Sequence, residues 1–562
     1  MRITSLFPFL NWPRPTAESM QRDVWAGITV GFVLVPQALA YATLAGMPPH
    51  TGLYAALIPS VIGILFGSSP LLAVGPVALT SLLVFSSLTS IAVPGSDQWV
   101  SLAIWLAIYS GLFQILFGLC KVGRAFALVS QPVLIGFTNA AALIIIVSQL
   151  PALIGLSSGG GQGLIEHIVH LPDMPKATLF ITSLFGVSAL LMLAALKKFA
   201  PHFPNLFCVL IIGIAASYAV NYAKLGGAIV RDIPSGLPHF LMPPAMPFEL
   251  HRQLIASAFV VAVVSFVEAM SSCRTLARSQ KTTWDENQEL IGQGLAKISS
   301  ALSGAFPVSG SFSRSALNVY AGAASAWSTL FAAACVLIAL LFLSAPLYFL
   351  PKAVLAAMIM VPVFGLVKVS AFRRLFAISK DDATVALVTF IVTLFSMPHL
   401  YWGVFVGTGL ATLFFLYRRM HPRIIEVAMH EDGTLRDRAR FALPRIAPDV
   451  FGVRMDSALN YITAPSLERF ITEKCREDRS IKQVLLCAGS INDIDSTGID
   501  MLEALVITLR GEGVDLFLTS VKIQVWRVMQ KAGIAERLRP AHVFSTDQQA
   551  VFQLATPHGK SE

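Results

Sequence analysis

Long apolar runs, separated by short polar stretches, fill the sequence up to about residue 420. A membrane-spanning helix needs about 20 apolar residues. Runs of this kind centre near residues 33, 60, 84, 109, 140, 186, 213, 263, 298, 335, 359, 388 and 409. A shorter, hydroxyl-rich run after Gly310 brings the number of segments to fourteen. The pattern predicts a polytopic α-helical membrane protein.

Two of the fourteen segments are short and interrupted. One opens at Gly75 and Pro76, the other follows Pro307 and Gly310, and a brief β-like stretch precedes each. They are the third of the first seven segments and the third of the second seven, which indicates a 7+7 inverted repeat. The binding site of such a repeat lies where the two breaks meet, so the count also predicts the place of the site.

After Tyr417 the pattern changes to charged residues and then to alternating strands and helices. We predict strands at 450–455, 484–488 and 515–519, and helices at 466–476, 496–510 and 523–532. This alternation is typical of a small α/β domain. The predicted parts are a cytoplasmic leader at 1–22, a transmembrane domain at 23–420, a linker at 421–440, the α/β domain at 441–556 and a tail at 557–562.

Composition supports this division. The chain is 55% hydrophobic and 13% charged, far more apolar than a soluble protein. Residues 1–420 hold 23 Lys and Arg against 13 Asp and Glu, while 421–562 hold 18 against 19. The basic residues of the first part gather in loops on one side, which predicts cytoplasmic termini and an inner (plasma) membrane location. The excess of positive charge therefore indicates contact with a lipid bilayer, and we expect no nucleic-acid partner.

A lone charge, Arg314, stands between Lys297 and Lys352 in the phrase FPVSGSFSRSALN. A charge inside such a tract costs roughly 2.5–3.5 kcal/mol on insertion scales, so it needs a partner or a polar cavity. The small, hydroxylated residues around it let backbone N–H groups face an anion at a helix start. We predict that Arg314 binds an anion or sets the field at its site. The alternative is that it only neutralises a buried carboxylate.

Glu268 is the other isolated charge. A carboxylate at that depth pairs with Arg314, binds a cation or takes up a proton. We favour cation or proton coupling, because an anion carrier that works against an inside-negative potential needs a co-transported positive charge or an exchanged anion. Ser272, one turn further on, adds a hydroxyl group. In the first segment, Gln37 and Tyr41 share one helical face, where they line the cavity or bond to a neighbouring helix.

The sequence contains no pattern of catalytic or metal-binding chemistry. It has no GxxxxGK[ST], no GxSxG and no His pair at metal spacing, and its six cysteines form no CxxC. We therefore expect no enzyme, no metal and no cofactor. In the α/β domain, Ser496 or Thr497 starts a predicted helix, either as its N-cap or as a phosphorylation site.

The sequence resembles the SulP sulfate permease family. VPQALAYATLAG (35–46), GPVALTSLL (75–83) and SGSFSRSALN (309–318) are similar to its first, third and tenth helices, and DIDSTGI is similar to the signature of STAS domains. The resemblance implies core and gate domains, elevator-like motion, homodimers and a cytoplasmic STAS domain open to a regulatory protein. It also implies that an anion lies between the N-terminal ends of the third and tenth helices.

The resemblance also assigns residues. The implied anion contacts are the backbone N–H groups near Val77, Ala78, Phe312 and Ser313, surrounded by Gln37, Tyr41 and Arg314. Glu268 takes the position of an acidic residue linked to proton or sodium coupling, and Ser496 that of a phosphorylated serine. We expect a proton-coupled sulfate transporter. The alternatives are sodium-coupled bicarbonate transport, C4-dicarboxylate transport, a nucleobase carrier, or an anion sensor that signals through the STAS domain.

Overall fold

The structure is a computed structural model that describes residues 7–12, 14–156, 176–200, 204–231, 234, 236–538 and 542–555. The predicted tail at 557–562 and part of the predicted leader lie outside the described residues. Contacts divide the chain into two compact units, with the boundary between Ala411 and Thr412. Each unit is considered by itself.

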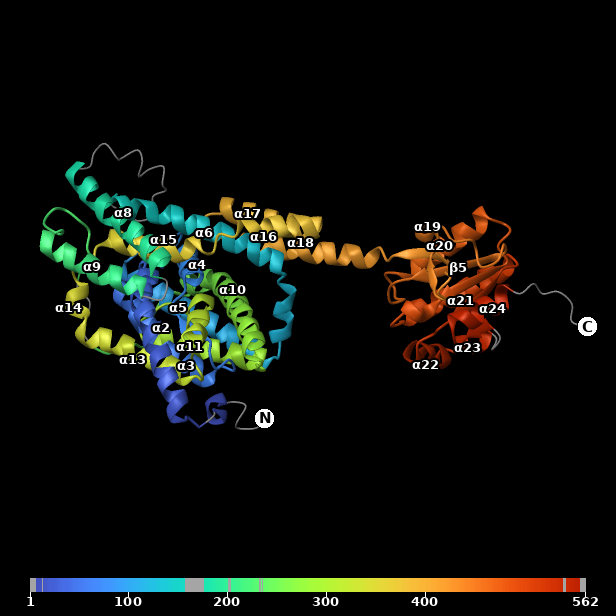
Figure 1. Ribbon diagram of the computed structural model, residues 1–562, viewed down its shortest axis with the longest axis horizontal. Coiled ribbons are helices and arrows are strands. Elements are labelled where there is room, and N and C mark those ends of the chain that lie inside the picture. The colour runs from blue at the N-terminus through green and yellow to red at the C-terminus, as the bar shows by residue number, and fades with distance from the viewer. Residues whose placement is uncertain are drawn as a thin grey trace, which may run out of the picture. The chain divides into compact units, whose positions relative to one another are not determined.

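Fourteen helices of the described residues follow the fourteen predicted segments (Figure 1). Those of the first half are α2 (Ala17–Leu44), α3 (Pro49–Phe66), α4 (Ala78–Leu88), α5 (Asp97–Leu119), α6 (Gln131–Ile154), α8 (Lys176–Phe199) and α9 (Asn205–Val220). Those of the second half are α10 (Phe248–Gln280), α11 (Glu286–Leu302), α12 (Phe312–Tyr320), α13 (Trp327–Phe342), α15 (Lys352–Phe364), α17 (Lys380–Phe395) and α18 (Tyr401–Met420). Shorter elements are η1 (Pro8–Asn11), η2 (Gly123–Leu128), α14 (Ser344–Leu347) and α16 (Val369–Ile378).

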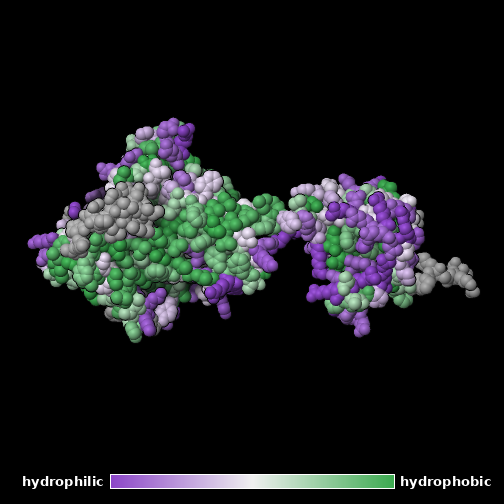
Figure 2. All heavy atoms as spheres, turned by 90° about the horizontal axis from the view of Figure 1, so that it is seen from above, coloured by the Kyte–Doolittle hydropathy of each residue, from purple (hydrophilic) through white to green (hydrophobic). Residues whose placement is uncertain are grey.

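Many of these helices have the length and composition of membrane spans. Seven described stretches are long and apolar enough to cross a membrane, and α4, α9 and α13 are shorter apolar helices. Large hydrophobic side chains are exposed on the outside of the unit, and Figure 2 shows hydrophobic residues over much of its visible face. Examples are Phe180, Leu191, Ile212, Phe342 and Phe395. Such a surface suits a hydrocarbon environment, because water would penalise it.

The helices pack in two groups. The core group consists of α2 to α5 with α10 to α13; within it α11 packs on α3 and α5, and α13 packs on α2 and α3. The gate group consists of α6, α8 and α9 with α15 to α18; within it α6 packs on α8, α15 and α17, and α18 packs on α17. Each group takes corresponding segments from both halves of the sequence, as the predicted inverted repeat requires.

Two short strands join the interrupted segments of the two halves. β1 (Ala73–Gly75) and β2 (Ser309–Ser311) pair antiparallel, with Ala73 opposite Ser311 and Gly75 opposite Ser309. α4 begins shortly after β1, and α12 begins directly after β2. The N-terminal ends of α4 and α12 therefore lie at one small sheet, where the two predicted breaks meet.

The second unit is a six-stranded sheet with helices. The strands have the order β4-β3-β5-β6-β7-β8, where β5 to β8 run parallel and β3 is antiparallel to β4 and β5. The strands are β3 (Ile424–Met429), β4 (Leu435–Asp437), β5 (Val450–Met455), β6 (Gln483–Cys487), β7 (Asp515–Thr519) and β8 (Val543–Phe544). The helical elements are α19 (Arg438–Phe441), α20 (Ala464–Glu477), η4 (Ala488–Ser490), α21 (Ser496–Gly511), α22 (Ile523–Lys531), α23 (Ile534–Arg537) and α24 (Asp547–Ala555).

The strands and helices expected from the alternating pattern appear within two residues of their predicted ends. The stretch 421–440, which we expected as a linker, contains β3 and β4 and so adds two strands to the sheet. These strands escape a pattern search because β3 is only partly buried and β4 has three residues.

Candidate functional site

Arg314 links the two halves of the core group. It lies in the first turn of α12 and is 1% exposed. Its Nη1 donates to the carbonyl oxygen of Pro76 at 2.8 Å and to Oε1 of Gln37 at 3.5 Å. Among the described residues, Nε and Nη2 have no hydrogen-bond partner. A buried guanidinium thus keeps N–H donors for a further acceptor at the junction of the two breaks.

Glu268 and Tyr41 lie near this guanidinium. Tyr41 on α2, Glu268 on α10 and Arg314 on α12 are close enough to interact electrostatically. Oε2 of Glu268 is buried and has no hydrogen-bond partner among the described residues, so the carboxylate does not form a hydrogen-bonded pair with Arg314 here. The Ser272 hydroxyl donates to the backbone carbonyl of Glu268 at 3.2 Å. The structure therefore brings three predicted site residues together from three helices.

The two helix starts differ in capping. Val77 is the N-cap of α4 and offers no side-chain bond, whereas Ser311 caps α12 and accepts from the Arg314 backbone N–H at 3.4 Å. Val77 and Ala78 are buried. Phe312 and Ser313 are exposed. The first N–H groups of an uncapped helix are free for an anion, which the helix dipole also favours.

Glycine at position 75 is required by the local geometry. Its φ is +152°, a conformation that residues with a side chain rarely adopt. A Cβ atom there would lie 3.3 Å from Nη2 of Arg314. Neighbouring bonds fix the strand: Ser60 Oγ donates to the Val74 carbonyl at 2.6 Å, and Ser315 Oγ accepts from the Ala73 N–H at 2.8 Å. The backbone at Gly75 is therefore held directly beside the guanidinium.

The sequence reading missed several buried polar residues that support the site. Asp23 on α2 is 1% exposed and accepts from the N–H groups of Ala324 and Ser325 at 2.7 and 3.0 Å, just beyond α12. Glu289 on α11 is 1% exposed and accepts from the N–H groups of Ser68 and Ser69 at 2.9 and 3.0 Å, just before β1. Both residues anchor the loops of the interrupted segments. Lys297 and Gln114 are also fully buried.

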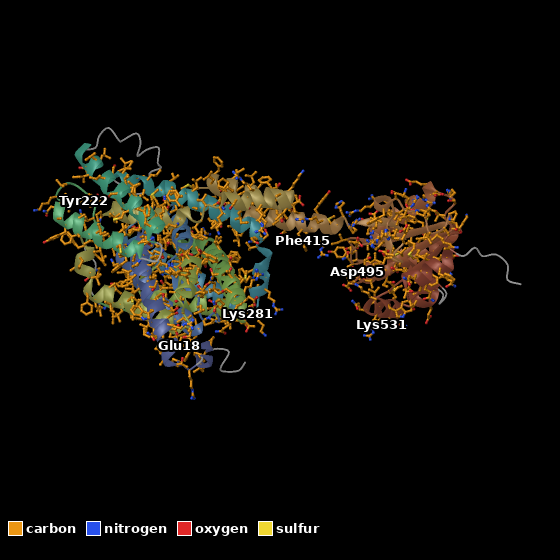
Figure 3. The ribbon with its side chains drawn as sticks, viewed as in Figure 1. Glu18, Tyr222, Lys281, Phe415, Asp495 and Lys531 are labelled. Carbon is orange, nitrogen blue, oxygen red and sulfur yellow. The ribbon has the colours of Figure 1, made fainter. Side chains whose placement is uncertain are left out.

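In the second unit, α21 begins at Ser496 as predicted, and its N-cap is the residue before. Asp495, marked in Figure 3, is the N-cap of α21, and its Oδ1 accepts from the Gly498 N–H at 2.8 Å. Ser496 and Thr497 are exposed in the first turn. The N-cap role considered for these two residues is therefore taken by Asp495, and both hydroxyl-bearing residues face outward.

Comparison with known proteins gives matches along nearly the whole chain. The model of the Sulfate permease family matches residues 20–389, and the STAS domain model matches residues 443–550. The chain is 31% identical to probable sulfate transporter 4.2 of Arabidopsis thaliana, over 95% of this chain and 81% of that protein. It is 30% identical to a probable sulfate transporter of Mycobacterium tuberculosis, over 95% of each chain.

A solved structure is also similar. The murine anion transporter Solute Carrier 26 family member A9, in the inward-facing state, has a TM-score of 0.86 at 23% identity. The match covers 98% of this chain and 94% of that chain. This likeness confirms the predicted fold class, a polytopic helical membrane domain followed by an α/β STAS domain.

Proposed function

The chain belongs to the sulfate permease family, and on this premise we propose that it is a secondary active transporter that takes up sulfate together with protons. Members of the family are transporters and not enzymes. The observation that carries the proposal is a buried guanidinium whose Nε and Nη2 groups have no partner among the described residues, beside a helix start without a side-chain cap. This arrangement offers several donors to an anion in a small space.

The proposed anion site uses backbone N–H groups and polar side chains as donors. The backbone N–H groups near Val77 and Ala78 at the start of α4, and those near Phe312 and Ser313 at the start of α12, bind the anion. Gln37, Tyr41 and Arg314, which are all buried, surround it. A site built on backbone donors recognises charge and size. Sulfate is proposed because the similar proteins of Arabidopsis thaliana and Mycobacterium tuberculosis are named probable sulfate transporters.

Glu268 is proposed to carry the coupled proton, with Ser272 beside it. Its buried carboxyl oxygen, which has no hydrogen-bond partner in the part of the chain that the structure describes, supports this assignment. An ionised carboxylate in the membrane interior is costly, so protonation accompanies its burial, and deprotonation accompanies access to water. The proton also cancels part of the negative charge that sulfate brings. Sodium is the competing coupling ion.

The test is uptake of labelled sulfate into proteoliposomes with the proton and sodium gradients set separately. A lower pH outside the vesicles should drive sulfate accumulation in the absence of sodium. Unlabelled sulfate should compete with labelled sulfate better than bicarbonate, fumarate or chloride does. Sodium-driven uptake that bicarbonate or fumarate inhibits most strongly would reverse the choice of substrate and ion. If the protein moves none of these anions under any gradient, the transporter proposal fails and an anion sensor becomes the better account.

We propose an elevator-type cycle in a homodimer, with both termini on the cytoplasmic side of the plasma membrane. The division into core and gate groups supports it, because the proposed side-chain site lies in the core group alone. In such a cycle the core group slides against the gate group, for example where α2 packs on α15. A cysteine pair across α2 and α15 should stop uptake when cross-linked and release it on reduction. Unchanged uptake after complete cross-linking would contradict the sliding motion.

Ser496 is a separate proposal, as a phosphorylation site through which a cytoplasmic protein acts on the STAS domain. It is exposed in the first turn of α21, where the helix dipole favours a phosphate. Membranes incubated with cytosol and labelled ATP should label the wild-type chain and the Thr497→Ala control, but not Ser496→Ala. Equal labelling of all three chains would contradict the proposal.

A further inference from the structure

A second buried cation lies between α5, α10 and α11, outside the proposed anion site. Lys297 on α11 is fully buried, and its Nζ donates to Oε1 of Gln114 on α5 at 2.9 Å. Nε2 of Gln114 donates to the Ala262 carbonyl at 2.8 Å and to Oγ of Ser265 at 3.1 Å, both on α10. Gln114 therefore joins Lys297 to the helix that carries Glu268.

Lys297 and Glu268 lie at similar depth. Consecutive helices α10 and α11 meet at the connection marked by Lys281 in Figure 3. Glu268 lies twelve residues before the end of α10 at Gln280, and Lys297 lies eleven residues after the start of α11 at Glu286. At about 1.5 Å per residue, both lie roughly 17 Å along their helices from the connection. The two residues act on each other electrostatically.

Close packing encloses Lys297. Helices α5 and α11 approach at Gly111 and Gly294, where a Cβ on either glycine would lie within 2.7 Å of the other's carbonyl oxygen. The same added Cβ on Gly111 would lie 3.2 Å from Cβ of Lys297. The residue is 0% exposed and its Nζ is bonded to Gln114, so the ammonium group does not reach a membrane surface as the end of an exposed lysine does. A charge held at this depth is costly, and such residues usually serve a function.

The network also contacts the strand pair. Ser265, which accepts from Gln114, lies one turn before Glu268, and its backbone carbonyl accepts from Oγ of Ser309 on β2 at 2.9 Å. The bonds thus run from Lys297 through Gln114 and α10 to the strand that leads into α12. A continuous set of hydrogen bonds therefore connects the ammonium group to the strand pair beside the anion site.

We propose that Lys297, held by Gln114, is a positioning residue for coupling, whose positive charge sets the pH at which Glu268 takes up its proton. The inference rests on the proposed proton coupling at Glu268. Arg314 from α12 and Tyr41 from α2 also act on this carboxylate. The neighbouring α4 and β2 contain no charged residue. On α5 the ionisable groups are Asp97 in its first turn and Tyr109, which bonds to His251. Glu289 on α11 accepts from backbone N–H groups before β1. Lys297 is therefore a second cation near the Glu268 carboxylate. The first, Arg314, is assigned to the anion.

The test is the pH profile of sulfate uptake in Lys297→Met, Lys297→Arg and wild type, at a fixed membrane potential. Proton-coupled uptake of sulfate rises as the external pH falls. Loss of a nearby positive charge makes a carboxylate easier to protonate. The half-maximal pH of Lys297→Met should therefore move upward by about one unit, while Lys297→Arg should stay near wild type. If Lys297→Met does not fold, Lys297→Gln, which keeps a donor for Gln114, makes the same comparison.

The outcomes separate this inference from the function on which it rests. A folded neutral variant with the wild-type pH profile overturns the role of Lys297. Complete loss of proton-driven uptake with sulfate binding retained also overturns it, because Lys297 would then carry the proton itself. If wild type itself shows uptake without proton dependence, the proposed coupling fails, and this inference fails with it.

Discussion

Glu268→Gln is expected to abolish proton-driven accumulation of sulfate while leaving sulfate binding detectable. Glutamine keeps the size of the side chain but cannot exchange a proton. The buried carboxyl oxygen has no hydrogen-bond partner among the described residues, so the substitution breaks no side-chain bond at that atom. We expect a loss on the order of a hundredfold, the scale seen when a positioned proton-transfer group is removed. Proteoliposome uptake under an acid-outside gradient measures the effect.

The matched control lies on the same helix. Glu249, in the first turn of α10, forms an exposed ion pair with Arg252 at 3.0 Å, and such pairs contribute little. Glu249→Gln should therefore transport like wild type.

Exchange of internal for external sulfate, measured in Glu268→Gln, should become independent of pH. Full proton-driven accumulation by Glu268→Gln would remove Glu268 from coupling and leave sodium or an exchanged anion as the driving partner.

The sequence predicted the structure best at the apolar runs, at the breaks within them and at the isolated charges. Thirteen apolar runs and one short, hydroxyl-rich run predicted fourteen helices, because lipid requires a spanning segment to satisfy its own backbone hydrogen bonds. The symmetric breaks at Gly75 and Gly310 predicted where the two halves meet. The isolated charges Arg314 and Glu268 stood out because their neighbours are apolar, and the structure places them close together.

Other features depend on contacts between residues far apart in sequence. Lys297 served in the sequence reading only as the end of an apolar tract, although it lies at the centre of a predicted span. Its partner Gln114 is 183 positions away. Asp23 and Glu289 carried no prediction, yet each is buried against backbone N–H groups of a distant segment. Spacing along the chain does not reveal such partners, because the fold alone brings them together.

Arg314→Ala is expected to weaken sulfate binding by about ten- to a hundredfold, since a hydrogen bond to a charged group contributes about 1.5–3 kcal/mol. Two of its three guanidinium nitrogens have no hydrogen-bond partner among the described residues. The third is held by Pro76 and Gln37. The Nε and Nη2 groups of the guanidinium are therefore available to an anion. Isothermal calorimetry on the purified protein measures the affinity, and its melting temperature checks that the variant is folded.

Arg314→Lys separates direct contact from an effect of charge alone. Lysine keeps the positive charge but has no planar fork of donors. If Arg314 contacts the anion through its fork, the lysine variant should bind almost as weakly as the alanine variant. If the guanidinium only sets the local field, the lysine variant should bind like wild type, and the backbone N–H groups of α4 and α12 provide the contacts. Wild-type affinity in Arg314→Ala would return this residue to a purely structural role at the junction of Pro76 and Gln37.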